Sequence, residues 1–153
     1  AALAALGRRD EALSEYAAAT AALPIPQFLV EYGELLDSAG RSGEARAQYD
    51  LAAASFGLLE ANGASDDLAR AQFEADHGDP AEALRRAQAE WGRRQSVFVA
   101  DALAWALHRN GRDAEALAYA RRALADGWHD PLPLRHLTEI EAALAAGPRG
   151  GAA

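Results

Sequence analysis

Apolar residues along this chain recur three and four positions apart, the spacing that places side chains on one face of an α-helix. The spacing is clearest in two sets, Leu29, Tyr32, Gly33 and Leu36, and Ala100, Leu103, Ala104 and Leu107. It predicts helices over 27–38 and 98–109. A later stretch, 132–144, has a similar pattern and follows Pro131, a residue favoured at the first position of a helix.

A short motif of glycine, glutamate and alanine occurs four times, with glutamate four residues and alanine five residues after the glycine. Its glycines are Gly7, Gly40, Gly78 and Gly111, separated by 33, 38 and 33 residues. Each glycine is predicted to form a turn between two helices, so that the glutamate lies in the first turn of the second helix, near the positive end of its dipole. In "DPAE" we expect Asp79 to cap a helix that starts at Pro80, and Glu82 to complete a capping box.

The repeating unit is therefore a helix, a tight turn and a second helix, with a period near 34 residues. Small residues allow the two helix axes of a unit to approach closely: Gly33 or Ala104 in the first helix, and Ala45 or Ala116 in the second. One such unit hides only part of its apolar surface, so several units must stack. The sequence predicts an all-α fold of the α-solenoid class.

This pattern resembles the tetratricopeptide repeat. The second unit matches best, through Leu29, Tyr32, Gly33, Leu36, Ala45 and Tyr49. The third departs most, because it follows an insertion around "LLEANGASD" and has Arg70, Ala71 and Glu74 where bulky apolar residues are usual. The resemblance implies a right-handed superhelix over 1–147, made of a partial repeat 1–24, repeats 26–57, 65–95 and 97–128, and a terminal helix 131–146. We expect 148–153 to be a flexible tail.

Composition narrows the classes of function. The 153 residues carry a formal net charge of -8, which opposes binding to nucleic acid and to anionic membranes. The longest uncharged stretch, 16–30, has 15 residues, whereas a helix needs about 20 to cross a bilayer. Cysteine is absent, which excludes disulfides and thiolate metal sites. Because methionine is absent and the chain opens on a helical pattern, we expect a piece of a longer protein. The compartment stays open, with the cytoplasm favoured.

The resemblance implies that a peptide or helix of a partner protein binds in a groove lined by the first helices. On the helical wheel of 98–109, the side chains opposite the apolar face include an aromatic, an acid, an imidazole and a guanidinium, the composition of an interface anchor. The predicted groove residues are Glu31, Glu34, Asp101, Trp105, His108, Arg109, Arg135, His136 and Glu139. The carboxylates among these residues favour a partner with a basic segment, because opposite charges attract. Two alternatives stay open: Trp105 packs against the neighbouring first helix, and the charged residues form an ordinary solvated face.

No pattern indicates a metal, a cofactor or an enzyme. The four histidines lack a second histidine or carboxylate at the spacing of a known metal-binding helix. The adjacent acids Asp66 and Asp67 follow Ser65 at an expected helix start, where capping explains them better than acid catalysis does.

The last helix suggests a second function. Leu137, Ile140 and Leu144 form an apolar stripe that a following helix would cover in a complete repeat. Either this helix caps the array, or the stripe binds another copy, or the array continues beyond the sequence. Three hypotheses follow: a protein-binding module, a self-assembling structural domain, or the regulatory region of a larger enzyme or sensor.

Overall fold

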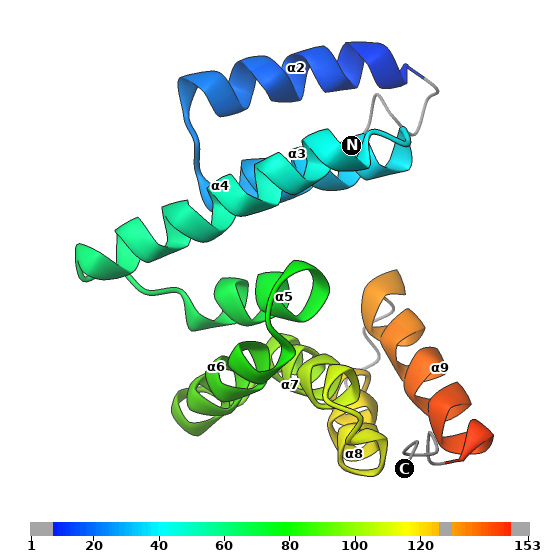
Figure 1. The fold of residues 1–153 in the computed structure, drawn as a ribbon. Helices are drawn as coiled ribbons and strands as arrows, with labels where there is room; N and C mark the ends of the chain where they lie inside the picture. Colours follow the sequence, from blue (N-terminus) through cyan, green and yellow to red (C-terminus); the bar gives the residue numbers. More distant parts are fainter. Residues whose placement is uncertain (1–7, 126–129, 148–153) are drawn as a thin grey trace, which may run out of the picture. The chain divides into compact units, whose positions relative to one another are not determined.

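The computed structural model describes residues 8–125 and 130–147, and this part of the chain is helical without strands (Figure 1). The helices are α2 (Arg9–Ala22), α3 (Pro26–Ser38), α4 (Ser42–Ala61), α5 (Asp67–His77), α6 (Pro80–Arg93), α7 (Val97–Arg109), α8 (Asp113–Ala123) and α9 (Pro131–Ala146). The predicted all-α class is confirmed. The predicted turn at Gly7, the end of repeat 97–128 and the tail 148–153 lie outside the described residues.

The chain divides into two compact units. Unit 1 is Ala1–Ser65 and holds α2 to α4, whereas unit 2 is Asp66–Ala153 and holds α5 to α9. The boundary falls at the end of the insertion that the sequence placed around "LLEANGASD". Continuous stacking of the repeats over 1–147, and the handedness of a superhelix, stay predictions.

The turns at Gly40 and Gly111 form as expected. Both glycines have positive φ, 75° and 71°, which residues with a Cβ rarely adopt. In the turn at Gly40, the Gly40 N–H donates to the Asp37 carbonyl and the Arg41 N–H donates to the Leu36 carbonyl, each at 2.9 Å. This pair of bonds is a Schellman motif, which satisfies carbonyls left over at the end of α3. The inserted segment uses the same motif at Gly63, where φ is 79°, and thereby ends α4.

The turn at Gly78 is built differently. Its φ is −128°, and the buried Glu74 side chain accepts the Asp79 N–H at 2.8 Å. Asp79 caps α6 as predicted, by accepting the Ala81 N–H. The predicted capping box is wrong, because the Asp79 N–H is taken by Glu74 while the Glu82 carboxylate is bound by two arginines of its own helix. A Cβ at position 78 would lie 1.9 Å from a Glu74 oxygen, so only glycine fits there without a shift of that side chain.

An arginine directly after the glycine supports the turns at Gly40 and Gly111, a feature that was not predicted from the sequence. It pairs with the glutamate three residues later, as in Arg41–Glu44 at 2.6 Å and Arg112–Glu115 at 2.7 Å. Arg8–Glu11 repeats the arrangement at 3.4 Å. Hydrogen bonds from the arginines lower the pKa of Glu44 and of Glu115. The repeated unit is thus marked by an Arg–Glu pair as well as by glycine and alanine.

In unit 1, α3 packs on both α2 and α4. α3 and α4 lie close together at Gly33, where the ring of Tyr49 from α4 covers the backbone. Leu29, Leu36 and Ala45 are fully buried around this crossing. The expected role of a small residue in bringing the two helices together is therefore confirmed at Gly33, and Ala45 is buried as that role requires.

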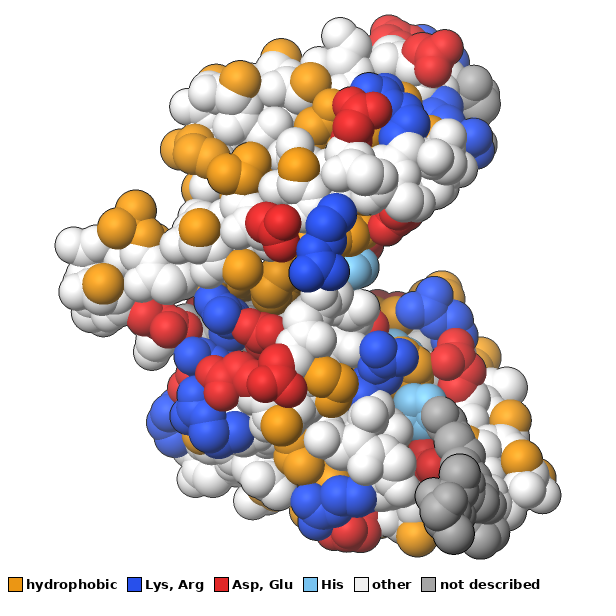
Figure 2. All heavy atoms as spheres, viewed as in Figure 1, with side chains coloured by type: hydrophobic (Ala, Val, Ile, Leu, Met, Phe, Trp, Pro, Cys, Tyr) orange, Lys and Arg blue, Asp and Glu red, His pale blue; other side chains and the backbone are white. Residues whose placement is uncertain are grey.

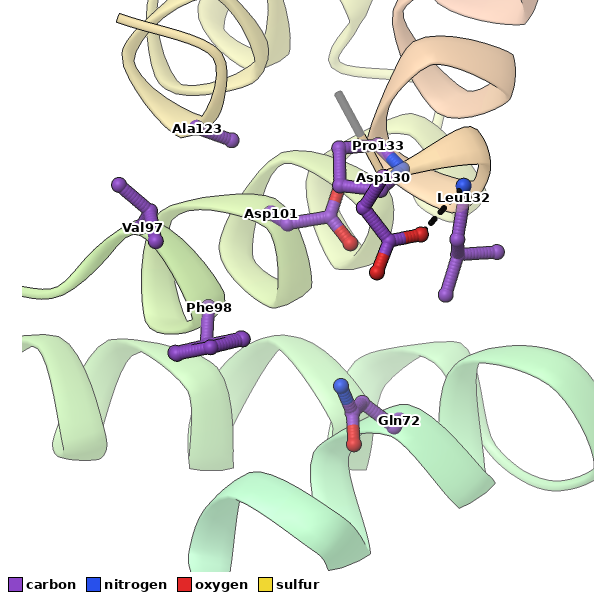
Figure 3. A pocket seen from close by; sticks show the side chains of 8 residues that line it. All are labelled: Gln72, Val97, Phe98, Asp101, Ala123, Asp130, Leu132 and Pro133. Atoms are coloured by element: carbon purple, nitrogen blue, oxygen red, sulfur yellow. Dashed lines mark hydrogen bonds between the residues drawn. The ribbon is translucent and has the colours of Figure 1, made fainter. Parts of the chain in front are cut away.

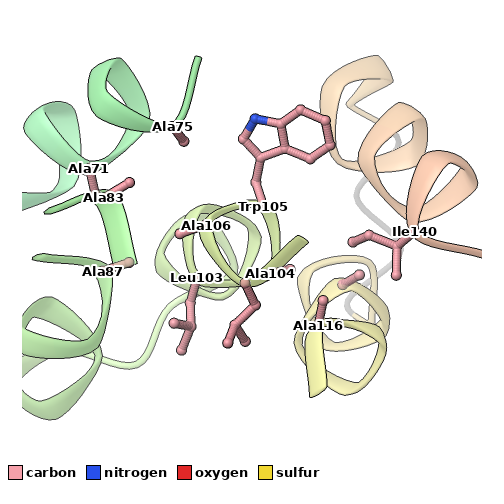
Figure 4. Packing of buried hydrophobic residues seen from close by; sticks show 12 residues of the cluster. Ala71, Ala75, Ala83, Ala87, Leu103, Ala104, Trp105, Ala106, Ala116 and Ile140 are labelled. Carbon is pink, nitrogen blue, oxygen red and sulfur yellow. The ribbon is translucent and has the colours of Figure 1, made fainter. Parts of the chain in front are cut away.

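In unit 2, α7 lies at the centre of the packing. It contacts α5, α6, α8 and α9, and every residue from Val99 to Leu107 is buried. Figure 4 shows α7 between the labelled alanines of α5 and α6 on one side and Ala116 of α8 and Ile140 of α9 on the other. α5 pairs with α6, and α7 pairs with α8. In addition, α7 contacts both α5 and α9. We call α5, α7 and α9 the first helices of unit 2.

Candidate functional site

The side chain of Trp105 lies inside unit 2. It is 8% exposed, and Figure 4 shows its ring projecting from α7 toward the space between α5 and α9. The indole Nε1 donates to Asp76 of α5 at 2.7 Å, and the ring stacks on His136 of α9 with a centroid distance of 4.1 Å. Trp105 therefore ties three first helices together. These contacts favour the interpretation in which Trp105 packs against neighbouring first helices over that of an exposed anchor.

His136, a predicted groove residue, is buried in the structure rather than open to a partner. Its side chain is 4% exposed, and its Nδ1 lies 3.0 and 3.1 Å from the two oxygens of Asp101, which is itself buried. The other ring nitrogen, Nε2, is buried without a hydrogen-bond partner. The pattern of 132–144 did not predict this, because it could not show that Asp101, 35 residues away on α7, supplies a partner for a polar group on the packed face.

The remaining predicted groove residues of unit 2 lie nearer the surface. His108 is half-buried, stacks on Trp105 at 4.9 Å and has its Nδ1 2.5 Å from Asp113 Oδ1. Arg109 is exposed. Arg135 and Glu139 are exposed and form an ion pair of 3.8 Å along α9. Exposed pairs of this kind contribute little to stability, so both side chains can be given up to a partner at small cost.

Glu31 and Glu34 belong to unit 1. The Glu31 carboxylate accepts the Tyr16 hydroxyl at 2.8 Å and the Gln27 amide at 3.0 Å, whereas Glu34 is exposed. Burial, followed by the hydrogen bond to Glu31, raises the pKa of Tyr16 to about 12. Glu31 therefore joins α2 to α3, and partner binding by these two acids stays a prediction.

The predicted self-association stripe on α9 is partly covered. Ile140 is 0% exposed and belongs to the core cluster of unit 2, against which Leu137 also packs. Leu144 is 37% exposed. The prediction that Ile140 is free for another copy is wrong, because α9 turns that residue toward α7 and α8.

A pocket that the sequence did not predict opens beside the first helices of unit 2. It has a volume of about 60 Å³ and is lined by Gln72, Val97, Phe98, Asp101, Ala123, Asp130, Leu132 and Pro133 (Figure 3). We call it the first-helix pocket, since α5, α7 and the start of α9 supply most of its walls. Of these residues only Asp101 is a predicted groove residue, although Phe98 lies on the same face of the 98–109 wheel. Phe98 and Asp130 were detectable as residues at helix starts, but not as neighbours.

The rim of the pocket is apolar and accessible. Phe98 is 50% exposed and Leu132 is 42% exposed, although both are large apolar side chains. Figure 3 shows the Asp101 and Asp130 carboxylates pointing into the space beside Phe98, Gln72 and Leu132. Asp130 caps α9 by accepting the Leu132 N–H at 2.9 Å, which fixes its carboxylate at this position.

A second charged region lies over α5 and α6, where Figure 2 shows acidic and basic side chains side by side. Asp67 is bound by Arg86 and Arg93, and the hydrogen bond from Arg93 lowers the pKa of Asp67. Glu82 is bound by Arg85 and Arg86, and the hydrogen bond from Arg85 lowers its pKa to about 2. A general acid needs a pKa near the working pH. Both carboxylates stay ionised; Asp67 joins α5 to α6, whereas Glu82 binds arginines of its own helix.

Within 8–125 and 130–147, no group of three or more histidines and acids is arranged to hold a metal ion. None of the helices in that part of the chain combines the length and the apolar character needed to cross a membrane. Comparison with protein-family models, with curated proteins and with solved structures gives no match.

Proposed function

We propose that this chain is a protein-binding module, a tetratricopeptide-like α-solenoid that holds a peptide or helix of a partner against its first helices. The observation that carries the proposal is the first-helix pocket with its exposed apolar rim. Large exposed apolar side chains beside a concave site are typical of surfaces that bind other proteins.

The packing of unit 2 supports this proposal. The pocket is lined by residues of three first helices, and α7, which supplies Val97, Phe98 and Asp101, is buried along most of its length. A helix held in this way keeps its first turn in one position. A surface that is ordered before binding loses little conformational entropy when a partner arrives.

The charge of the chain favours one kind of partner. With a net charge of -8, the protein attracts basic segments and repels acidic ones over distances of about a Debye length, 8 Å at physiological salt. Such attraction acts mainly on the rate of association. We therefore propose a protein partner that carries a basic segment.

A peptide-display selection tests the proposal. The immobilised whole chain is offered a random peptide library, and the enriched peptides are measured against Phe98→Ser and against Leu51→Ser, a control on α4 with almost equal exposure, 53%. We expect binding to weaken at least tenfold with Phe98→Ser and to be unchanged with Leu51→Ser. Enriched peptides that bind both variants as well as they bind the wild type would overturn the proposal.

A further inference from the structure

We propose that the first-helix pocket receives the cationic side chain of an arginine or lysine in the partner segment, while apolar side chains of that segment rest on Phe98 and Leu132. The inference rests on the proposed function and adds the chemistry of the bound residue. It comes from the composition of the pocket, which combines apolar walls with two carboxylates.

The charges at the pocket favour a cation. The described residues that line it include two aspartates and no arginine. The helices that line it do carry arginines, and four of these have partners elsewhere: Arg70 with Glu74 at 2.7 Å, Arg121 with Glu141 at 3.4 Å, Arg122 over the ring of Trp91 at 4.9 Å, and Arg135 with Glu139. Arg109 is the last residue of α7, whereas the pocket is lined by residues near the start of that helix. Among the described residues that line the pocket, no arginine neutralises this negative charge.

Two positive groups act on the pocket against its two carboxylates, and together they do not cancel the charge of both. The N-terminus of α9 has the positive end of the helix dipole, about half an elementary charge, but Asp130 caps that end with a whole negative charge. His136 faces Asp101 from α9, and it reduces the charge of that carboxylate only when the imidazole is protonated. With His136 neutral, the balance at the pocket is negative.

The shape of the site favours a side chain over a free ion. A metal ion such as Mg²⁺ or Ca²⁺ needs about six oxygen ligands, whereas most of the wall here is apolar: Val97, Phe98, Ala123, Leu132 and Pro133. Arginine and lysine carry a charged group on an aliphatic stem, so that the stem covers apolar surface while the head meets carboxylates. Only one Asp130 oxygen is used by the Leu132 N–H, and a carboxylate has acceptor capacity for more donors.

The test uses peptides enriched by the wild-type chain and a matched pair of variants. Asp130→Asn removes one charge from the pocket but keeps a good N-cap for α9. Asp66→Asn makes the same change at the N-cap of α5, where the Asp66 side chain accepts the Ala69 N–H at 3.0 Å. Each enriched peptide is also made with citrulline in place of arginine, or norleucine in place of lysine. Affinities are measured by calorimetry at two salt concentrations.

We expect the enriched peptides to contain arginine or lysine. Asp130→Asn should weaken their binding about tenfold, as should the neutral replacement in the peptide, because a hydrogen bond to a charged group is lost. The two changes together should cost little more than either alone, and Asp66→Asn should cost nothing beyond a small effect at low salt. The neutral peptide tests the site on the wild-type fold, so the result does not depend on the stability of Asp130→Asn.

The outcomes separate the two proposals. Peptides that require Phe98 but contain no cation, or that bind equally well after the neutral replacement, overturn this inference and leave the protein-binding function standing. Peptides that bind Phe98→Ser as tightly as they bind the wild type overturn the proposed function itself. An equal loss with Asp130→Asn and Asp66→Asn shows a general charge effect and also overturns the inference.

Discussion

The close approach of α3 and α4 at Gly33 allows a sharp test of the packing in unit 1. A Cβ at this position would lie 2.4 Å from Cε1 of Tyr49 and 2.9 Å from Cδ1 and Cζ, whereas ordinary contacts begin at 3.4 Å. The ring would have to move by about 1 Å. Tyr49 is buried, and its hydroxyl donates to Asp37 at 2.9 Å, so the ring is held at its far end as well.

Two effects of Gly33→Ala oppose each other. Forcing an additional carbon into a packed core costs about 1–3 kcal/mol. Replacing glycine with alanine inside a helix gains about 1 kcal/mol. The net expectation is a loss of about 0–2 kcal/mol in the free energy of unfolding. Gly57 of α4 is the matched control, because a Cβ there meets nothing within 4 Å. Gly57→Ala should therefore gain about 1 kcal/mol, and the difference between the two variants, about 1–3 kcal/mol, isolates the steric cost.

Urea unfolding of the whole chain measures these values. Far-UV circular dichroism follows both units, and tryptophan fluorescence follows unit 2 alone, because Trp91, Trp105 and Trp128 all belong to it. A Gly33→Ala variant as stable as Gly57→Ala would show that the helices do not approach as described. Tyr49→Leu offers a second check, since removal of the ring should abolish most of the steric cost of Gly33→Ala.

Three further predictions concern unit 2. Trp105→Ala should lower the free energy of unfolding by about 3–5 kcal/mol, measured by denaturation, because a buried aromatic that joins three helices is lost; a variant that loses partner binding at unchanged stability would contradict this. Ile140→Glu should unfold unit 2 whereas Leu144→Glu should not, as judged by circular dichroism, since only Ile140 is fully buried. If Ile140→Glu instead stays folded and only changes the oligomeric mass, Ile140 belongs to an exposed self-association stripe and this reasoning is refuted. Glu82 has a folded pKa of about 2, below its usual 4.5, so its stabilising effect is complete above pH 4.5 and is lost as the pH falls toward 2. Arg85→Gln should therefore flatten the acid side of the stability profile, and an unchanged profile would refute the role of that pair.

Much of the helical framework was predictable from the chain alone. The turns at Gly40 and Gly111 and the cap at Asp79 follow from local rules: glycine adopts positive φ, and a short acid accepts the N–H groups at a helix start. The capping box at Glu82 shows the limit of such rules. Its residues are in the right order, but Glu74 from the preceding helix takes the N–H that the box requires.

The candidate site was predicted less well, for a related reason. Helical wheels separate apolar from polar faces, and they assign histidine and tryptophan to the surface when the opposite face is apolar. His136 and Trp105 are nevertheless buried, because Asp101 and Asp76 supply hydrogen bonds from 35 and 29 residues away. The first-helix pocket likewise combines residues from 72 to 133, and no local pattern marks them as neighbours.

The sequence by itself determined where most helices begin and end and where turns join them, since these features depend on side chains within a few residues of one another. The tertiary structure alone decided which polar groups are buried and which apolar ones stay exposed. A polar side chain enters a core only when a distant residue satisfies its hydrogen bonds, and that partner is known only once the helices have packed.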